Sequence, residues 1–354
     1  MNKIEVQKIQ LAIDKANNTS GVEALEIIPE LNDIEGTNRF DSIEEKDYLK
    51  IVLFNAERGK YLEEIDAYMK YHPALIDADI IFFNELDKGM IRTGNKDTAL
   101  ELAGRLSMNY IYGVEFLELT KGGSRERKVP GENNEAFHGN AIMSRYELKD
   151  SFLIRLPLEY DWFHDNQKRL GGRMALFAKV RVGNNEVGLV CTHLENMTSS
   201  TGRKNQMDYI LKQADKHYPD IPVIIAGDMN TNTFNSNDKK DVEKAYLDFE
   251  KETDRIYSPQ LYEAMFQSVE EHGFDYINAN VKGKLTRRKH KIGKDDLLLN
   301  LDWFFVKDMH CHQTNVVNTI FCNKELSGFQ MEQSEGIEIS DHNAIVLKAY
   351  FKKN

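Results

Sequence analysis

The chain has 354 residues, 41% of them hydrophobic and 29% charged, which is typical of a folded globular protein that can bury a sizeable core. Its net charge of −11 argues against a protein that holds nucleic acid through overall positive charge. No apolar run of signal-peptide length begins the chain, and no run of 18 apolar residues occurs in it. We therefore expect a cytoplasmic protein without an integral membrane segment, although a secreted protein that had lost its leader would have the same sequence.

The chain contains three cysteines, Cys191, Cys311 and Cys322. Their number is odd and their spacing is not that of a metal site, so a reducing compartment is the simpler interpretation. A bridge between Cys311 and Cys322 stays open.

Polar helix formers dominate residues 1–48, where helices are predicted at 4–16 and 22–31, on either side of the helix-breaking stretch "NNTSG". From residue 49 onward, buried strands alternate with amphipathic helices. The strands are predicted at 49–55 and 77–85, and the helices at 61–71 and 96–108.

The middle of the chain is mostly strand-like. Strands are predicted at 109–119, 139–146, 150–158, 173–182 and 186–194, with a hairpin turn at Gly183-Asn184-Asn185. They are followed by a helix at about 202–217, a strand at 221–228, polar helical stretches within 234–272, and strands at 299–307, 312–321 and 342–351. Long strands mixed with βα units favour an α/β fold in which two mixed sheets pack face to face with helices outside.

Several of these strands end or begin with polar side chains that can do chemistry. They are Asn55 and Glu57, Asn84 and Glu85, His193 with Glu195 and Asn196, Asp228 and Asn230, Asp302, and Asp341 with His342. Each has a structural explanation, since Gly-Asp-x-Asn is good turn chemistry and a single His is more often a packed core residue than a catalyst. Six such positions in one chain, all at strand ends, indicate a shared polar site.

Taken in order, these motifs resemble those of the endonuclease/exonuclease/phosphatase superfamily, which includes deoxyribonuclease I, exonuclease III and the sphingomyelinases. The matching segments, between about residues 50 and 352, are Asn55-x-Glu57, Glu85, "GNAIMSR", "THLE", "GDMN", "LDW" and "SDH". The resemblance implies a four-layer α/β sandwich of the deoxyribonuclease I type for the catalytic domain, residues 49–354. Because every motif lies at or beyond Asn55, residues 1–48 are predicted to be a helical N-terminal extension outside that domain.

The resemblance also implies a Mg²⁺-dependent phosphoesterase, with Mn²⁺ as an alternative ion, and assigns the metal ligands. Glu85 would be the principal ligand, and Glu57 and Asp341 would help to hold the ion. Asn55 would orient Glu85 or contact the phosphate. Mg²⁺ suits such a site because it keeps several waters and is held by one or two carboxylates together with substrate phosphate.

The remaining motifs imply the groups that act on water and on the phosphate. Asp228 would position or deprotonate the attacking water, and Asn230 would hold that water or a phosphate oxygen. His342, oriented by Asp302, would act as the base or as a charged donor, so the identity of the proton acceptor stays open between His342 and Asp228. His193 would donate to a non-bridging oxygen or to the leaving group.

Four further residues are candidates for substrate contact. Asn196, three residues beyond His193, is a weaker candidate for the phosphate. Arg145 and Arg173 are either phosphate contacts or structural ion-pair partners. Arg92 belongs to "GMIRTGNKD", which is either a substrate-recognition loop or a turn before the next helix.

Two other segments are placed by their composition. The run "KGKLTRRKHKIGK", residues 282–294, has seven Lys or Arg among thirteen residues and is either a solvated loop or a basic rim that brings Arg287 to the mouth of the site. "LEYDWFHDN" exposes Trp162 and Phe163, as rim packing or as lipid anchors.

The shared motifs do not choose the substrate, which is a phosphodiester or phosphomonoester in a nucleic acid, a nucleotide or a phospholipid headgroup. The alternative is a catalytically silent module that binds a phosphate ligand on the same fold. Such a module is expected to lack a metal carboxylate or the final histidine, and this chain keeps both. No protein partner can be inferred.

Overall fold

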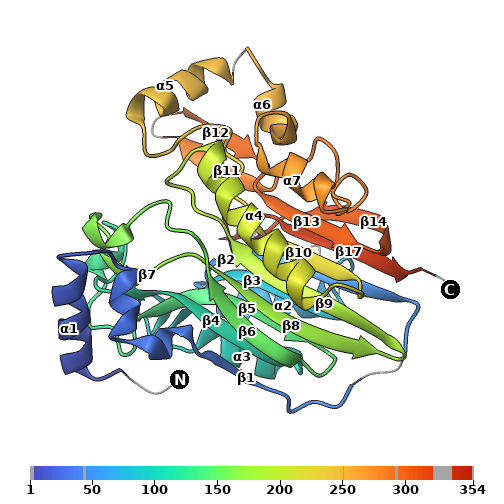
Figure 1. Ribbon diagram of the computed structural model, residues 1–354, viewed down its shortest axis with the longest axis horizontal. Helices are drawn as coiled ribbons and strands as arrows, with labels where there is room; N and C mark the ends of the chain where they lie inside the picture. Colours follow the sequence, from blue (N-terminus) through green and yellow to red (C-terminus); the bar gives the residue numbers. More distant parts are fainter. Residues whose placement is uncertain (1–3, 43–44, 250, 292–293, 322–336, 353–354) are drawn as a thin grey trace.

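Two β-sheets form the centre of the molecule, as the computed structural model of the protein shows in Figure 1. It describes residues 4–42, 45–249, 251–291, 294–321 and 337–352. The 8-stranded sheet has the order β1-β4-β5-β3-β2-β17-β14, with β7 paired to β4, and the 5-stranded sheet has the order β13-β10-β9-β8-β6. Both sheets are mixed, because β2 runs parallel to β3 and β9 parallel to β10 while the neighbouring pairs are antiparallel.

The strands of the larger sheet are β1 (Ile34–Thr37), β2 (Tyr48–Arg58), β3 (Ile80–Lys88), β4 (Asn109–Glu118), β5 (Phe137–Ser144), β7 (Arg169–Gly171), β14 (Met309–Val317) and β17 (Ala344–Phe351). Those of the smaller sheet are β6 (Lys149–Arg155), β8 (Met174–Val182), β9 (Asn185–His193), β10 (Val223–Asp228) and β13 (Asp302–Lys307). Two hairpin-like pairs lie outside the sheets, β11 (Arg287–Lys291) with β12 (Lys294–Leu299), and β15 (Ile320–Phe321) with β16 (Ile337–Glu338).

Helices cover the outer faces of the two sheets. The α-helices are α1 (Val6–Ala16), α2 (Leu62–Tyr71), α3 (Thr98–Leu106), α4 (Ser200–His217), α5 (Lys239–Asp248), α6 (Asp254–Tyr257) and α7 (Met265–Glu271). The 3-10 helices are η1 (Glu23–Glu26), η2 (Pro29–Asn32), η3 (Ile91–Thr93), η4 (Glu126–Lys128), η5 (Trp162–His164) and η6 (Pro259–Leu261). In Figure 1, α4 and α7 lie over the smaller sheet, and α2 and α3 lie behind the larger one. By contrast, α5 and α6 lie beside the β11–β12 pair.

The alternation of side chains along each strand divides the apolar core into layers. In β2, Ile51 and Leu53 join the cluster between the two sheets, whereas Val52 and Phe54 join the cluster beneath α2 and α3. In β10, Ile225 points instead to a third cluster under α4 and α7. The order of layers is therefore helix, sheet, sheet, helix, and the predicted four-layer α/β sandwich is confirmed.

The predicted strands and helices beyond residue 49 are present, with shifts of a few residues at their ends. Residues 1–48 need two corrections to their helical description. The helix predicted at 22–31 is instead the two short 3-10 helices η1 and η2. After α1, η1 and η2, residues 34–37 form the edge strand β1, which pairs with β4. The first helix also packs into the core of the larger sheet through Ala12 and Ala16. The boundary between an extension and a catalytic domain at residue 48 stays a prediction.

The structure bears on two expectations, the state of the cysteines and the lack of an integral membrane segment. Cys191 and Cys311 are free and buried, and Cys322 lies outside the described residues. In the part of the chain that is described, every helix is too short or too polar to cross a lipid bilayer. The predicted cytoplasmic location stays a prediction.

The strand that leads to Asp228 requires a glycine at its penultimate position. A Cβ atom on Gly227 would lie 1.8 Å from the backbone oxygen of Thr192 in β9, so the two parallel strands would have to separate. We expect Gly227→Ala to lower the free energy of unfolding by about 1–3 kcal/mol or more, the usual cost of overpacking. Urea denaturation measures it.

Gly104→Ala is the matched control, because no atom lies within 4 Å of a Cβ built at this position of α3. Alanine favours a helix over glycine, so this variant should be unchanged or stabilised by up to about 1 kcal/mol. Equal stability of the Gly227 and Gly104 variants would contradict the close contact between β9 and β10.

Candidate active site

The predicted site residues converge on one cavity at the ends of β2, β3, β9 and β10. The cavity has a volume of about 240 Å³. Ten of the fourteen residues named as candidates line it: Glu57, Glu85, Arg173, His193, Asn196, Asp228, Asn230, Arg287, Asp341 and His342. Asn55 and Asp302 lie directly behind this lining and hydrogen-bond to it.

Two β-bulges turn glutamates toward this cavity. The register of β2 against β3 shifts between Asn55 and Arg58, and that of β3 against β5 shifts between Phe83 and Leu86. Within these bulges Glu57 has φ +44° and Glu85 has φ +56°, a left-handed conformation that L-residues rarely adopt. A bulge re-aims one side chain without ending the strand. The bulges thus place both carboxylates in the cavity.

Asn55 connects the two sheets at the floor of the site. Its Nδ2 donates to Oδ2 of Asp228, 3.1 Å away, and lies 3.3 Å from Oε1 of Glu85. Its backbone oxygen accepts from the hydroxyl of Ser340, 2.7 Å away, in the loop that carries Asp341. The predicted orienting role of Asn55 toward Glu85 therefore has a matching contact, and the same amide also orients Asp228.

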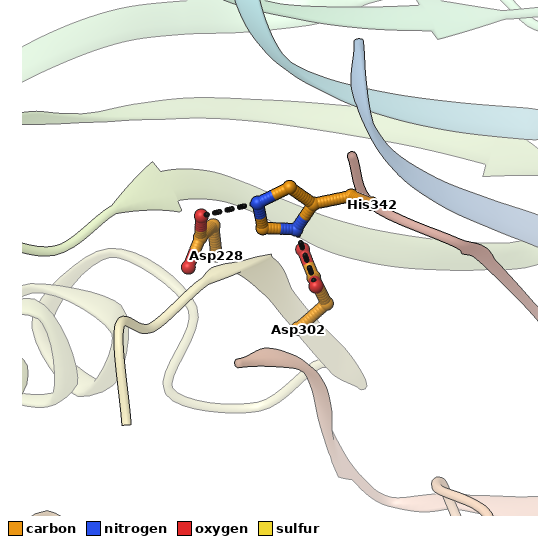
Figure 2. Close-up of side chains that lie close together, drawn as sticks. All are labelled: Asp228, Asp302 and His342. Carbon is orange, nitrogen blue, oxygen red and sulfur yellow. Dashed lines mark hydrogen bonds and ion pairs between the residues drawn. The ribbon is translucent and has the colours of Figure 1, made fainter. Parts of the chain in front are cut away.

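His342 lies between two carboxylates (Figure 2). Its Nδ1 is 2.7 Å from Oδ2 of Asp302, and its Nε2 is 3.6 Å from Oδ2 of Asp228. All three side chains are buried. The bond to Asp302 fixes the plane of the ring and directs Nε2 toward Asp228 and the cavity.

The proton balance of this group follows from burial and charge. Burial alone lowers the pKa of His342, but the carboxylates of Asp302 and Asp228 outweigh it and raise that pKa to about 9. Burial raises the pKa of Asp228 to about 7, with Asp302 adding to the rise and His342 opposing it. At neutral pH the imidazole is thus positively charged, and Asp228 is poised to gain or lose a proton.

His193 and Asn230 flank Asp228 on its other side. His193 Nε2 lies 3.5 Å from Oδ2 of Asp228, and burial together with the charge of Arg173 holds the pKa of His193 well below its usual range. This ring is therefore neutral at pH 7. Asn230, at φ +49°, donates from its backbone N–H to Asp228 and from its side chain to the backbone oxygen of Leu194.

The carboxylates at the opposite wall are ionised and could hold a cation. Burial opposes ionisation of Glu85, but the charge of Arg58, helped by that of His342, keeps its pKa well below the usual range. Burial also opposes ionisation of Asp341, but the charge of Arg287 outweighs it and lowers the pKa of this carboxyl. The backbone N–H of Asp341 lies 3.3 Å from Oε2 of Glu57. Oxygen ligands of this kind fit a hard divalent cation such as Mg²⁺.

A second group in the cavity also has ligand chemistry. One atom each of Asp228, Asp302 and His342 lie within 4.8 Å of one another. The histidine nitrogen that faces Asp302 is already used in a 2.7 Å hydrogen bond. This group is therefore better suited to holding a proton than a hard cation. The carboxylates of Glu85, Glu57 and Asp341 form the better metal site.

Two predicted substrate contacts are not at the site. Arg145 lies at the far end of β5, beside the start of β3, where it pairs with Asp77. Arg92 is buried beneath the site, where its guanidinium binds Asp87 at 2.7 Å and lies near two further carboxylates. Its charge is already neutralised, so it supports the site from behind. Its partner Asp87 also binds His138, which lines the cavity.

The basic run contributes one residue to the cavity and one to the fold. Residues 287–291 and 294–299 form the β11–β12 pair, and Arg287 bridges to His342 in backbone pairing and to Asp341 through its side chain. Arg288 is buried and donates to Glu338, Asn343 and Ser340, so it fixes the loop before His342. Arg287 is at the mouth of the site as predicted, and Arg288 is not a surface charge.

The sequence alone gave no role to several residues of the cavity. Arg58, His138, Gln167 and Arg169 also line it, as do Trp162 and Arg173, which had been left between two explanations. Arg58 directly follows Glu57, so its place after a strand-end motif was a usable signal. Arg169 has no such signal, because it reaches the cavity only through the pairing of β7 with β4.

Comparisons with known proteins agree with this architecture. Residues 52–342 match the Endonuclease/Exonuclease/phosphatase family. No curated protein matches the chain.

Solved structures with a similar fold come from several bacteria. The endonuclease/exonuclease/phosphatase from Beutenbergia cavernae DSM 12333 is 15% identical with a TM-score of 0.54, over 86% of this chain and 72% of that one. A family protein from Leptotrichia buccalis C-1013-b (15%, TM-score 0.51) and the beta toxin from Staphylococcus aureus (16%, TM-score 0.51) each match 86% of this chain and 100% of their own. At these identities the likeness shows the fold alone. The family match, which spans most of the chain, shows that this protein belongs to the endonuclease/exonuclease/phosphatase family.

Proposed function

We propose that this chain is a Mg²⁺-dependent phosphoesterase that hydrolyses a phosphodiester or phosphomonoester by in-line attack of a water molecule. The observation that carries the proposal is the convergence, in one cavity, of the Asp302–His342–Asp228 group with the ionised carboxylates of Glu85 and Asp341. One half of the cavity can accept a proton, and the other can hold a cation. Phosphoester hydrolysis needs both functions.

Asp228 is proposed to accept the proton of the attacking water. Its pKa of about 7 matches the neutral range in which a general base works best. Asn55 and the backbone N–H of Asn230 hold its carboxylate in place. His342, charged through its pair with Asp302, would stabilise the negative charge that develops on the phosphate oxygens.

His193 and the metal wall complete the proposed chemistry. The neutral His193 ring can donate one hydrogen bond to a non-bridging oxygen or to the leaving group. Glu85, with Glu57 and Asp341, would hold a Mg²⁺ ion, which when bound would neutralise charge on the phosphate and on the departing oxygen. The natural substrate would belong to the nucleic acids, the nucleotides or the phospholipid headgroups.

Removal of divalent metal should abolish turnover. After exhaustive chelation, hydrolysis of bis-p-nitrophenyl phosphate should fall to background, and added Mg²⁺ or Mn²⁺ should restore it, because the cation that Glu85, Glu57 and Asp341 would hold neutralises charge on the phosphate. Undiminished turnover of the chelated protein would contradict the proposal. A protein that binds phosphate but never turns over with any metal would be the silent binding module.

The members of the Asp302–His342 pair should act as a unit. Asp302→Asn and His342→Ala should each lower kcat by about 10²–10⁴, because each removes the charge that stabilises the phosphate oxygens, and Asp228→Asn should do the same by removing the proton acceptor. The Asp302→Asn/His342→Ala double variant should be little slower than the slower single variant.

A matched histidine–carboxylate pair serves as the control for these variants. His272 Nδ1 lies 2.5 Å from Asp215 in a part of the fold remote from the cavity lining. His272→Ala should therefore keep kcat within about twofold. Additive losses for Asp302→Asn and His342→Ala would show that they act separately.

The charge on His342 can be measured without turnover. In the metal-free protein, NMR titration should show a pKa near 9 for this histidine, and Asp302→Asn should lower it because the nearest carboxylate is neutralised. A folded-state pKa above the unfolded value of about 6.5 stabilises the fold at low pH, and this contribution is lost as the pH rises through about 9. A pKa of His342 below 6.5 would contradict the assignment.

A further inference from the structure

The cavity has a second wall, made of arginines, that makes no direct contact with the phosphate in the proposed hydrolysis. Arg58, Arg169 and Arg173 line it together, and we call these three residues the arginine recess. The proposed chemistry at the scissile phosphate is already supplied by His193, His342 and the metal ion that the Glu85 carboxylate would hold. Three more guanidinium groups exceed what one phosphate requires.

Each arginine of the recess is held from behind by a glutamate that is not part of the cavity lining. Arg58 Nε lies 3.2 Å from Glu126, Arg169 Nε lies 3.1 Å from Glu118, and Arg173 Nη1 lies 3.2 Å from Oε2 of Glu115. For Arg58 and Arg169 the glutamate faces the Nε edge. Both arginines line the cavity, so each glutamate leaves part of the guanidinium group free to face a ligand there.

Arg169 is the most rigidly placed of the three. Its guanidinium lies 5.0 Å from the ring centre of Phe116 and 4.7 Å from that of Trp162, within the range of cation–π contacts. Trp162 is itself fixed by a 2.9 Å hydrogen bond to Glu195. Only 8% of Arg169 is exposed, so its charge has already been withdrawn from bulk water.

The recess has unused hydrogen-bond donors. The Nε atoms of Arg58 and Arg169 face Glu126 and Glu118 as ion pairs, and among the residues that the structure describes neither side chain donates a hydrogen bond of ordinary geometry. An oxyanion in the cavity could therefore make strong charge-assisted bonds to the remaining donors of these two guanidinium groups. A guanidinium pair with fixed planes fits the oxygens of a phosphate or a carboxylate.

We infer that the arginine recess is a second anion subsite, and that the substrate carries a further phosphate or carboxylate group beside the phosphoester that is cleaved. The inference rests on the proposed function, since it takes the other end of the cavity as the cleavage site. Within a cavity of about 240 Å³, the second anion must lie within a few bonds of the first. A substrate whose only charge is the scissile phosphate would make no use of the recess.

Matched phosphonates test this inference without relying on turnover. Alkane α,ω-bisphosphonates with one to four methylene groups are compared by calorimetry with monophosphonates of the same chain length, at a fixed concentration of free Mg²⁺. We expect at least one bisphosphonate to bind tenfold or more tightly than its partner. The absence of a preference above threefold in the whole series would overturn the second subsite.

The variants locate the preference on the recess. Arg58→Gln and Arg169→Gln should each reduce the preference for the bisphosphonate by roughly tenfold or more, the usual cost of a hydrogen bond to a charged group. Arg145→Gln removes the same charge from an arginine outside the cavity and should leave the preference unchanged. Thermal unfolding checks that the variants fold, and the less buried Arg58 covers the case in which Arg169→Gln does not.

The test of the second anion subsite can be distinguished from the test of the proposed hydrolysis. Hydrolysis of bis-p-nitrophenyl phosphate is measured on the same samples. A bisphosphonate preference that depends on Arg58 supports the subsite even if no metal restores hydrolysis. Metal-dependent hydrolysis together with an unchanged preference in both Arg58→Gln and Arg169→Gln would overturn the subsite and leave the phosphoesterase in place.

Discussion

One buried amide, that of Asn84, fixes the two sheets relative to each other at the site. From β3 of the larger sheet, its Nδ2 donates to the backbone oxygen of Thr192 in β9 at 2.9 Å, and its Oδ1 accepts from the backbone N–H of Asp228 in β10 at 2.8 Å. The same Nδ2 also lies 3.0 Å from Oδ1 of Asn140 in β5. Glu85 follows Asn84 in the chain, and His193 follows Thr192. The Asn84 side chain thus sets the separation of the two catalytic walls.

This polar bridge matters because most of the side chains packed between the sheets are apolar. Contacts among side chains such as Leu53, Phe82 and Leu189 are non-directional, so they favour burial but do not specify how far one sheet is shifted along the other. A buried amide is satisfied in only one relative position, and each bond lost from it costs about 1–3 kcal/mol. The apolar layer therefore supplies the stability of the sandwich, and Asn84 supplies its register.

The sequence predicted the parts of the site that follow from strand order and missed those that follow from lateral pairing. Asp228 and Glu85 were found because an apolar strand ended in a carboxylate. Arg145 also follows a strand, but β5 runs antiparallel to β3, so its end lies at the opposite edge. Direction within the sheet is a tertiary property, and the pattern along one strand does not contain it. Arg169 was missed for the same reason, since its role depends on the β7–β4 pairing.

The strained backbone at the strand ends indicates that the surrounding structure holds the walls of the cavity firmly. Glu57, Glu85 and Asn230 all have left-handed backbone conformations, each costing of order 1–3 kcal/mol. Such a cost persists only where the surroundings over-determine the geometry, as the Asn84 bridge does here. Because the cost is met in the folded state, these groups need little reorganisation when a phosphate arrives. The arginines held by glutamates on the opposite wall follow the same logic: attractive contacts behind each charge keep it aimed at the cavity before any ligand is present.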